Sequence, residues 1–148
     1  MNPQSDIFDP QFLEALKYKT PFFLFSRKKI IENFKKFKKL FPKSTIHYAM
    51  KANSETEVIK TIFKVGCSFE VASMYELSML KKIKVPAQKM IYGTSVKPTF
   101  HIKEFFKFGV DRFAFDSPQE LEKIASVAPH SRVYVRTIAN DTGSVFKF

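Results

Sequence analysis

The sequence predicts an α/β fold that forms part of a (βα)8 barrel, and three observations point to it. Short apolar runs alternate with amphipathic segments of about 10 to 15 residues, the pattern of βαβ units around a parallel sheet. The apolar runs are nearly continuous, as expected for strands covered on both faces. The chain has only four glycines and no G-x-G-x-x-G motif, so nothing marks the switch point of a doubly wound sheet. Both architectures fit the alternation, and we favour the barrel.

The composition is that of one ordinary domain with its own core. The chain has 148 residues, of which 45% are hydrophobic. Its single cysteine excludes an internal disulfide and suits a reducing compartment. No apolar run approaches the ~18 residues that a membrane span needs, and residues 1–10 are polar, without an apolar signal core. We therefore expect a cytoplasmic protein that does not bind membranes.

Residues 1–43 are predicted to form an N-terminal segment with the first helix, and residues 44–148 an incomplete barrel domain. The elements predicted in the first part are a helix at Phe12–Tyr18, a strand at Phe22–Phe25 and an amphipathic helix at Arg27–Leu40. Ser26 is a suitable N-cap for the amphipathic helix, which ends before Pro42.

The net charge of +11 allows two interpretations. Residues 27–43 carry eight basic side chains, which would suit a face that binds nucleic acid. Apolar residues recur in the same stretch at helical spacing, however: Ile30, Ile31, Phe34, Phe37 and Phe41. This pattern is typical of a helix with phenylalanine inward and lysine in solvent. We expect a solvated lysine-rich surface and no binding of nucleic acid.

Five strands are predicted in the barrel part, at Thr45–Met50, Phe69–Ala72, Met90–Gly93, Arg112–Phe115 and Arg132–Ile138. Helices between them are predicted to begin at Ser54, Ser73, Pro98 and either Asp116 or Ser117, and the glycines 66 and 109 to end two of them. Residues 140–143 are predicted to form a loop. Because a closed barrel needs eight strands, we expect the sequence to be a fragment cut in mid-domain.

Chemistry in such a barrel takes place at the C-terminal ends of the strands. Lys51, Glu70, Gly93, Asp116 and Arg136 all fall at predicted strand ends. A lysine that ends a buried strand is costly unless its charge is paired or its amine reacts, and an unprotonated amine forms a Schiff base with an aldehyde cofactor. From the pattern alone, a lysine that simply reaches solvent fits better.

Several motifs favour a reactive lysine over one that only reaches solvent. Residues 48–53, Tyr-Ala-Met-Lys-Ala-Asn, resemble the Y-A-V-K-A-N of the fold-type III pyridoxal phosphate decarboxylases, the ornithine and diaminopimelate decarboxylase family. Residues 66–73 resemble the family's G-x-x-F-D-V-A-S, and residues 115–121 its F-D-S-x-x-E-L. Residues 135–138 resemble the family's strand that ends in an arginine. The resemblance covers about 120 residues and implies a barrel of the alanine racemase-like type.

The resemblance also implies roles for individual residues. Lys51 would be the Schiff-base lysine of pyridoxal 5'-phosphate, and Ala49 would pack near the cofactor ring. Arg136 would lie by the pyridine ring. Glu70 stands where the family has an aspartate near the lysine and the substrate amine, and it is one methylene longer. Lys51 and Glu70 are therefore the expected catalytic residues, and the expected cofactor-binding residues are Lys51, Ala49, Glu70 and Arg136; no metal site is expected.

The implied activity is decarboxylation of ornithine to putrescine in polyamine biosynthesis, by a homodimer. Decarboxylation of another basic amino acid or of diaminopimelate remains an alternative, and so does a non-catalytic paralogue that regulates an active partner. The family's stacking histidine, Gly-rich phosphate loop and cross-dimer segment would follow Phe148, so we expect the 148-residue chain alone to be inactive.

Of the remaining candidates, His47 is expected to face inward, His101 and His130 to lie at the surface, and Cys67 to be a packed thiol rather than a nucleophile.

Overall fold

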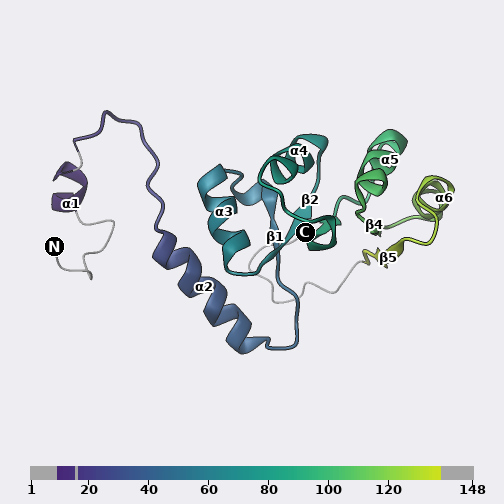
Figure 1. Cartoon of the computed structure of the whole chain (residues 1–148), viewed down its shortest axis with the longest axis horizontal. Coiled ribbons are helices and arrows are strands. Elements are labelled where there is room, and N and C mark those ends of the chain that lie inside the picture. Colours follow the sequence, from purple (N-terminus) through teal and green to yellow (C-terminus); the bar gives the residue numbers. More distant parts are fainter. Residues whose placement is uncertain (1–9, 16, 138–148) are drawn as a thin grey trace.

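Five parallel strands form one sheet in the computed structural model, which describes residues 10–15 and 17–137 (Figure 1). The strands are β1 His47–Ala49, β2 Ser68–Val71, β3 Met90–Tyr92, β4 Arg112–Phe115 and β5 Arg132–Val135. They lie in the order β1-β2-β3-β4-β5, so each strand pairs with its neighbours in sequence. All five predicted barrel strands are thereby confirmed, although each is shorter than or equal to its predicted range.

The strand order decides between the two architectures that fitted the sequence. A doubly wound sheet reverses its order at a switch point, whereas this order advances in one direction throughout. Right-handed crossovers that all step the same way bring their helices to one face of the sheet, as a barrel requires. These helices are α3 Thr56–Lys64, α4 Met74–Lys82, α5 Thr99–Phe108 and α6 Pro118–Val127 (Figure 1). Within the described residues the barrel is not closed, because β1 and β5 each have a single neighbour.

The core lies between the sheet and these helices. The fully buried large side chains include Phe69, Tyr92 and Phe113 from successive strands, and Tyr92 stacks on Phe105 of α5 with ring centroids 4.1 Å apart. Each such side chain contributes about 1.5–3 kcal/mol by leaving water. β5 differs from the other strands because all four of its residues are exposed, so the expectation of coverage on both faces fails there.

Most of the predicted helix ends are confirmed. The Ser73 hydroxyl accepts from the Glu76 amide at 3.2 Å, and the Ser117 hydroxyl accepts from the Glu120 amide at 3.3 Å. Gly109 ends α5 with φ of 102°, a conformation that glycine adopts without steric cost. Ser54 is a correction: the N-cap of α3 is Glu55, whose side chain makes no capping bond, and Asn53 Oδ1 accepts from the Glu55 amide instead.

The N-terminal part differs from prediction in two elements. The strand expected at Phe22–Phe25 is wrong, because this segment pairs with no strand among the described residues and a lone strand leaves its backbone groups unbonded. The first helix, α1, spans Pro10–Ala15, earlier than predicted. α2 spans Arg27–Leu40 and is capped by Ser26 as expected. The loop predicted at residues 140–143 and the end of the strand predicted to reach Ile138 lie outside the described residues.

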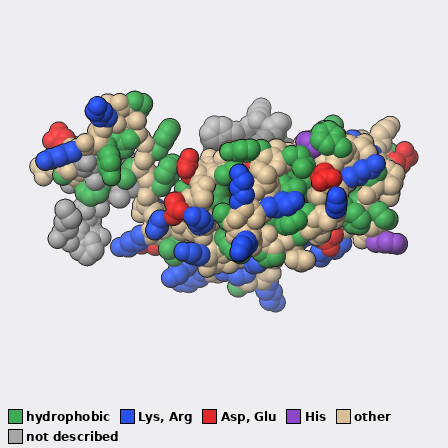
Figure 2. All heavy atoms as spheres, turned by 45° about the horizontal axis from the view of Figure 1, so that its top comes forward, with side chains coloured by type: hydrophobic (Ala, Val, Ile, Leu, Met, Phe, Trp, Pro, Cys, Tyr) green, Lys and Arg blue, Asp and Glu red, His purple; other side chains and the backbone are tan. Residues whose placement is uncertain are grey.

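The surface carries lysine and arginine over much of its area. Figure 2 shows these side chains dispersed across one face among polar and apolar groups, instead of gathered in a single patch. On α2, Ile30 and Phe34 pack against the core as expected, but Phe37 is 52% exposed. The predicted inward position of every phenylalanine of this helix is therefore wrong. None of the described helices has the length and apolar character needed to cross a membrane.

Candidate active site

A cavity of about 280 Å³ lies at the C-terminal edge of the sheet. It is lined by Ala49, Lys51, Glu70, Ala72, Gly93, Thr94 and Arg136. These residues come from the ends of β1, β2, β3 and β5, which parallel pairing brings to one edge. All four site residues predicted from the sequence are thus brought together, whereas Asp116 does not line this cavity. Its volume is close to the lower end of the ~300–1,000 Å³ usual for small-molecule sites.

Lys51 lies in a short 3-10 helix, η1 Met50–Ala52, that follows β1 directly. The side chain is exposed, as the sequence pattern alone indicated. The physical reason is that the chain leaves the sheet at Ala49, and η1 then lifts Lys51 to the rim of the cavity. Its amine forms no ion pair or hydrogen bond with another described residue, which leaves it available to a ligand.

Glu70 is half-buried in β2, and its side chain lies over Gly93. A methyl group added at Gly93 would overlap the Oε1, Cγ and Cδ atoms of Glu70. The absence of a side chain at residue 93 therefore makes the space that the Glu70 carboxylate occupies.

Arg136 follows β5 and is held by two hydrogen bonds. Its backbone amide donates to the Phe115 carbonyl at 2.8 Å, which continues the β4–β5 ladder. Its Nη1 atom donates to the Ser95 hydroxyl at 3.3 Å. A guanidinium has five N–H donors, and among the described residues only Nη1 is bonded, so the others can bind an anionic or acceptor group in the cavity.

A buried ion pair that sequence reasoning missed supports this edge of the sheet. Lys97 is 1% exposed, and its Nζ atom donates to the carbonyls of Thr94 at 2.9 Å, Ser95 at 3.0 Å and Ala114 at 2.6 Å. The same atom lies 2.9 Å from Glu120 Oε1. Lys97 therefore ties the segment that carries Thr94 and Ser95 to the end of β4 and to α6. Glu120 falls in the motif at residues 115–121, but nothing in the sequence indicated that its side chain meets Lys97.

The titration of this pair follows from its burial. Burial lowers the pKa of Lys97, while the hydrogen bond and charge of Glu120 act in the opposite direction. Burial alone would raise the pKa of Glu120, but hydrogen bonds from Lys123 and Lys97 outweigh it and lower that pKa. The carboxylate form of Glu120 is therefore favoured in the folded protein.

The remaining titratable candidates are structural. His101 is half-buried with its Nδ1 atom 3.0 Å from the Tyr92 hydroxyl, so the expected surface position is wrong, whereas His130 is exposed as expected. His47 is half-buried, and burial followed by the charge of Arg112 lowers its pKa. Cys67 is buried, and its Sγ atom donates to the Ile46 carbonyl at 3.2 Å, which confirms a packed thiol. Among the described residues no group of three His, Cys, Asp or Glu side chains could hold a metal ion.

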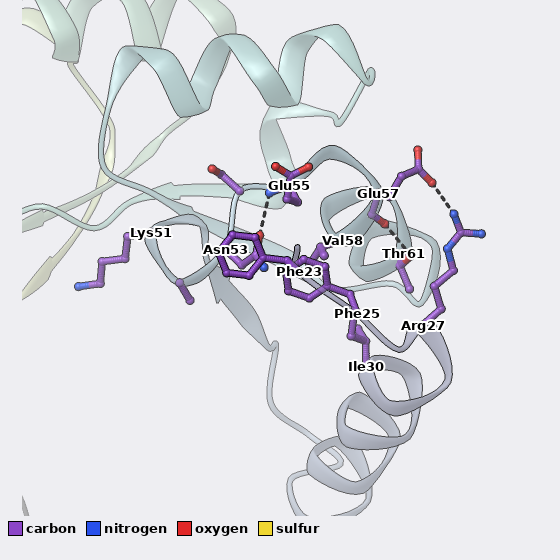
Figure 3. A pocket seen from close by; sticks show the side chains of 12 residues that line it. Phe23, Phe25, Arg27, Ile30, Lys51, Asn53, Glu55, Glu57, Val58 and Thr61 are labelled. Carbon is purple, nitrogen blue, oxygen red and sulfur yellow. Dashed lines mark hydrogen bonds and ion pairs between the residues drawn. The ribbon is translucent and has the colours of Figure 1, made fainter. Parts of the chain in front are cut away.

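A larger, open cavity of about 690 Å³ adjoins η1 on its other side. It lies between the segment around Phe23 and Phe25 and the start of α3 (Figure 3). Arg27 closes one wall through an ion pair with Glu57, at 2.6 Å. Lys51 lines both cavities, but Figure 3 shows its side chain extending away from Phe23 and Phe25. The reactive groups predicted from the sequence therefore face the smaller cavity.

Residues 27–148 match the family described as "Pyridoxal-dependent decarboxylase, pyridoxal binding domain". This chain belongs to that family. A "Lysine/ornithine decarboxylase" of Selenomonas ruminantium is 35% identical over 122 residues, which are 82% of this chain and 31% of the relative. "Ornithine decarboxylase" of Mus musculus is 29% identical over 142 residues, 95% of this chain and 31% of the relative. The chain thus spans about a third of the length of the decarboxylases it matches.

Solved structures of the decarboxylase family share the fold. The crystal structure of SrLDC in complex with PLP and cadaverine superposes with a TM-score of 0.85 at 32% identity, covering 90% of this chain and 35% of that one. The family also includes relatives that carry another name. "Antizyme inhibitor 2" of Xenopus laevis is 29% identical over 123 residues, 83% of this chain and 27% of the relative. The predicted family and barrel-type fold are confirmed.

Proposed function

We propose that this chain supplies the cofactor-binding part of a pyridoxal phosphate-dependent decarboxylase that converts ornithine to putrescine. The observation that carries the proposal is the convergence of Lys51, Glu70 and Arg136 on one cavity at the C-terminal edge of the sheet. An amine can bind an aldehyde cofactor, and a carboxylate can bind an amino substrate. A guanidinium can bind an anionic group or an aromatic nitrogen.

The residues present fit pyridoxal phosphate. Lys51 offers an unpaired amine at the rim, where it can bind the cofactor aldehyde. Ala49 is small enough to leave room for an aromatic ring above β1, and Arg136 keeps free N–H donors beside it. Bound pyridoxal phosphate supplies an electron sink for the electron pair that remains when the substrate carboxylate leaves as CO2.

The chain's own side chains have separate tasks in this proposal. Lys51 would hold the cofactor through its amine at the rim of the cavity. Glu70 accepts a hydrogen bond from the substrate amine and orients the bond that breaks. Exclusion of water falls to segments that cover the cavity, because the described residues leave it open on one side.

Ornithine is the substrate we favour, with lysine, another basic amino acid and diaminopimelate as alternatives. Support comes from the relatives, which include ornithine and lysine/ornithine decarboxylases. A substrate with two amino groups also suits a cavity whose wall includes the Glu70 carboxylate. We further propose that the complete enzyme is a homodimer.

The test is CO2 release from ornithine, lysine and diaminopimelate by the complete protein, with Lys51→Ala beside it. We expect ornithine to give the highest kcat/KM and Lys51→Ala to lower activity by about 1,000-fold or more, the scale of removing a covalent catalyst. Lys103→Ala, an exposed lysine on α5, is the matched control and should retain activity. Unchanged activity of Lys51→Ala would refute the role of Lys51. A higher kcat/KM with free lysine than with ornithine would show that lysine is the preferred substrate.

A second candidate is a non-catalytic partner of an active decarboxylase. The match to antizyme inhibitor 2 supports this second candidate. In that case the complete protein would release no CO2 from any of the substrates, and it would co-purify with a full-length decarboxylase. The 148-residue chain by itself should be inactive in either case, and detectable CO2 release by it would contradict our expectation.

A further inference from the structure

Glu70 and Gly93 lie on neighbouring strands at the mouth of the cavity. In the β2–β3 register Glu70 is opposite Ile91, so Gly93 is its diagonal neighbour, two residues further along. A long side chain reaches a diagonal neighbour across parallel strands, and the Glu70 side chain does so here. Both residues line the cavity that contains Lys51 and Arg136.

With the Glu70 side chain in its present position, no other residue fits at position 93. A Cβ atom built on Gly93 would lie 2.5 Å from Glu70 Cδ, and closer still to Cγ and Oε1. Cβ atoms in real proteins essentially never approach a neighbour within 3.0 Å. Because Cγ is near the base of the side chain, a small swing of the carboxylate would not relieve the overlap. The whole Glu70 side chain would have to take another rotamer.

Backbone conformation does not account for the glycine. The described glycines with positive φ are Gly66 and Gly109, and Gly93 is not among them, so its backbone is open to any residue. Its amide is fixed, since it donates to the Val71 carbonyl at 3.1 Å. The backbone at residue 93 therefore cannot easily retreat, and the side chain of Glu70 is the part that must yield.

Nothing else in the described part of the chain holds the carboxylate in place. Glu70 forms no hydrogen bond or ion pair with residues 17–137, and its interactions there are long-range charge effects on His47 and Tyr134. Steric fit over Gly93 is therefore what sets its position. A glutamate is one methylene longer than an aspartate, and the space left by Gly93 is where that extra length is accommodated.

We propose that Gly93 is a positioning residue that sets the Glu70 carboxylate in the cofactor cavity, and that the two residues form a pair matched in size. The expected effect on cofactor binding rests on the proposed function. It predicts that a larger residue at 93 harms the site through Glu70, and that shortening residue 70 relieves the harm.

The test uses four variants of the complete protein: Gly93→Ala, Glu70→Asp, and Gly93→Ala combined with either Glu70→Asp or Glu70→Gln. The measurement is pyridoxal phosphate affinity by absorbance titration, with borohydride reduction and peptide mass mapping to locate the modified lysine. We expect Gly93→Ala to weaken affinity about tenfold or more, since misplacing a site group by 1 Å costs up to about 100-fold. Adding Glu70→Asp should restore affinity to within about threefold of the single Glu70→Asp protein.

Glu70→Gln is the control that separates size from charge. It keeps the length of the side chain, so it should not rescue Gly93→Ala. The proposal is overturned if Gly93→Ala binds the cofactor as well as the unmodified protein, or if Gln rescues as well as Asp.

A readout independent of the cofactor distinguishes failure of this inference from failure of the proposed function. In urea unfolding, Gly93→Ala should cost less stability in the Glu70→Asp background than in the unmodified protein. If the unmodified protein binds no pyridoxal phosphate but this coupling is present, the proposed function fails and the size match stands. Additive stability changes would refute the size match itself.

Discussion

At the residue scale, Lys97 places a buried charge beside the cavity wall. Its ammonium group has no exposed side-chain area, yet it is bonded to three carbonyls and to Glu120, whose side chain is 4% exposed. A buried charge with this many partners is stable only while all of them remain, because removing one leaves the others uncompensated. The ammonium group binds the carbonyls of Thr94 and Ser95. Thr94 lines the cavity, and the Ser95 hydroxyl accepts a hydrogen bond from Arg136.

Glu120→Gln is therefore expected to destabilise the protein by about 3–5 kcal/mol, the scale of breaking a buried ion pair. The measurement is urea unfolding followed by circular dichroism. Lys123→Ala is the matched control, because Lys123 pairs with the same carboxylate at 2.5 Å but is 29% exposed, and it should cost under about 1 kcal/mol. Equal effects of the two substitutions would show that the ammonium of Lys97 does not depend on Glu120.

The same carboxylate predicts a pH dependence. The pKa of Glu120 is lowered below its ordinary value of 4.5 in the folded protein, so the ionised form is favoured on folding. Its contribution to stability is fully present above pH 4.5 and is lost as the pH falls through the lower folded pKa. Unfolding free energy measured between neutral pH and pH 3 should fall less steeply for Glu120→Gln than for the unmodified protein. Parallel curves would contradict this assignment.

At the scale of elements, the helix N-termini show what a local pattern can and cannot predict. Ser73 and Ser117 both follow strands and precede a glutamate by three residues, and both cap as predicted. Ser54 has the same spacing to Glu57, but η1 changes the direction of the chain before α3, and the helix begins one residue later. Capping patterns are therefore reliable here where a strand leads directly into a helix.

Ser117→Ala should lower the free energy of unfolding by about 1 kcal/mol, because the Glu120 amide loses its acceptor at the start of α6. Ser54→Ala should change it by less than about 0.5 kcal/mol, since Ser54 caps no helix. Urea unfolding of both variants checks the prediction. A loss at Ser54 as large as that at Ser117 would contradict the assigned start of α3.

The candidate site could be predicted from the sequence because strand ends are local features. A parallel sheet brings those ends together whatever lies between them, so Ala49, Lys51, Glu70 and Arg136 met as expected. Features that depend on tertiary contacts were out of reach. The partnership of Lys97 with Glu120, for example, joins segments 23 residues apart.

At the scale of the whole molecule, the described sheet has two free edges and several exposed apolar groups. Val135 on β5 is 56% exposed, and Phe23 is 90% exposed beside the larger cavity. Such surfaces are normally covered, and an uncovered strand edge is a template for pairing with another chain.

We therefore expect the isolated 148-residue chain to self-associate. Light scattering coupled to size exclusion should give masses above the 17.2 kDa of one chain, increasing with concentration. Val133→Lys on β5 should reduce the association, because an edge lysine opposes strand pairing. Lys84→Ala, at a turn distant from β5, is a control that should leave it unchanged. A monomer at all concentrations would contradict the prediction.

The strand order has a consequence for how the protein is made. Strands that pair in the order of synthesis can dock one after another as the chain emerges, each on an edge that is already folded. The walls of the cavity, however, come from both β1 and the end of β5. Lys51 is therefore translated well before Arg136. If both residues hold the cofactor as proposed, we expect its stable capture only after the last described strand has joined the sheet.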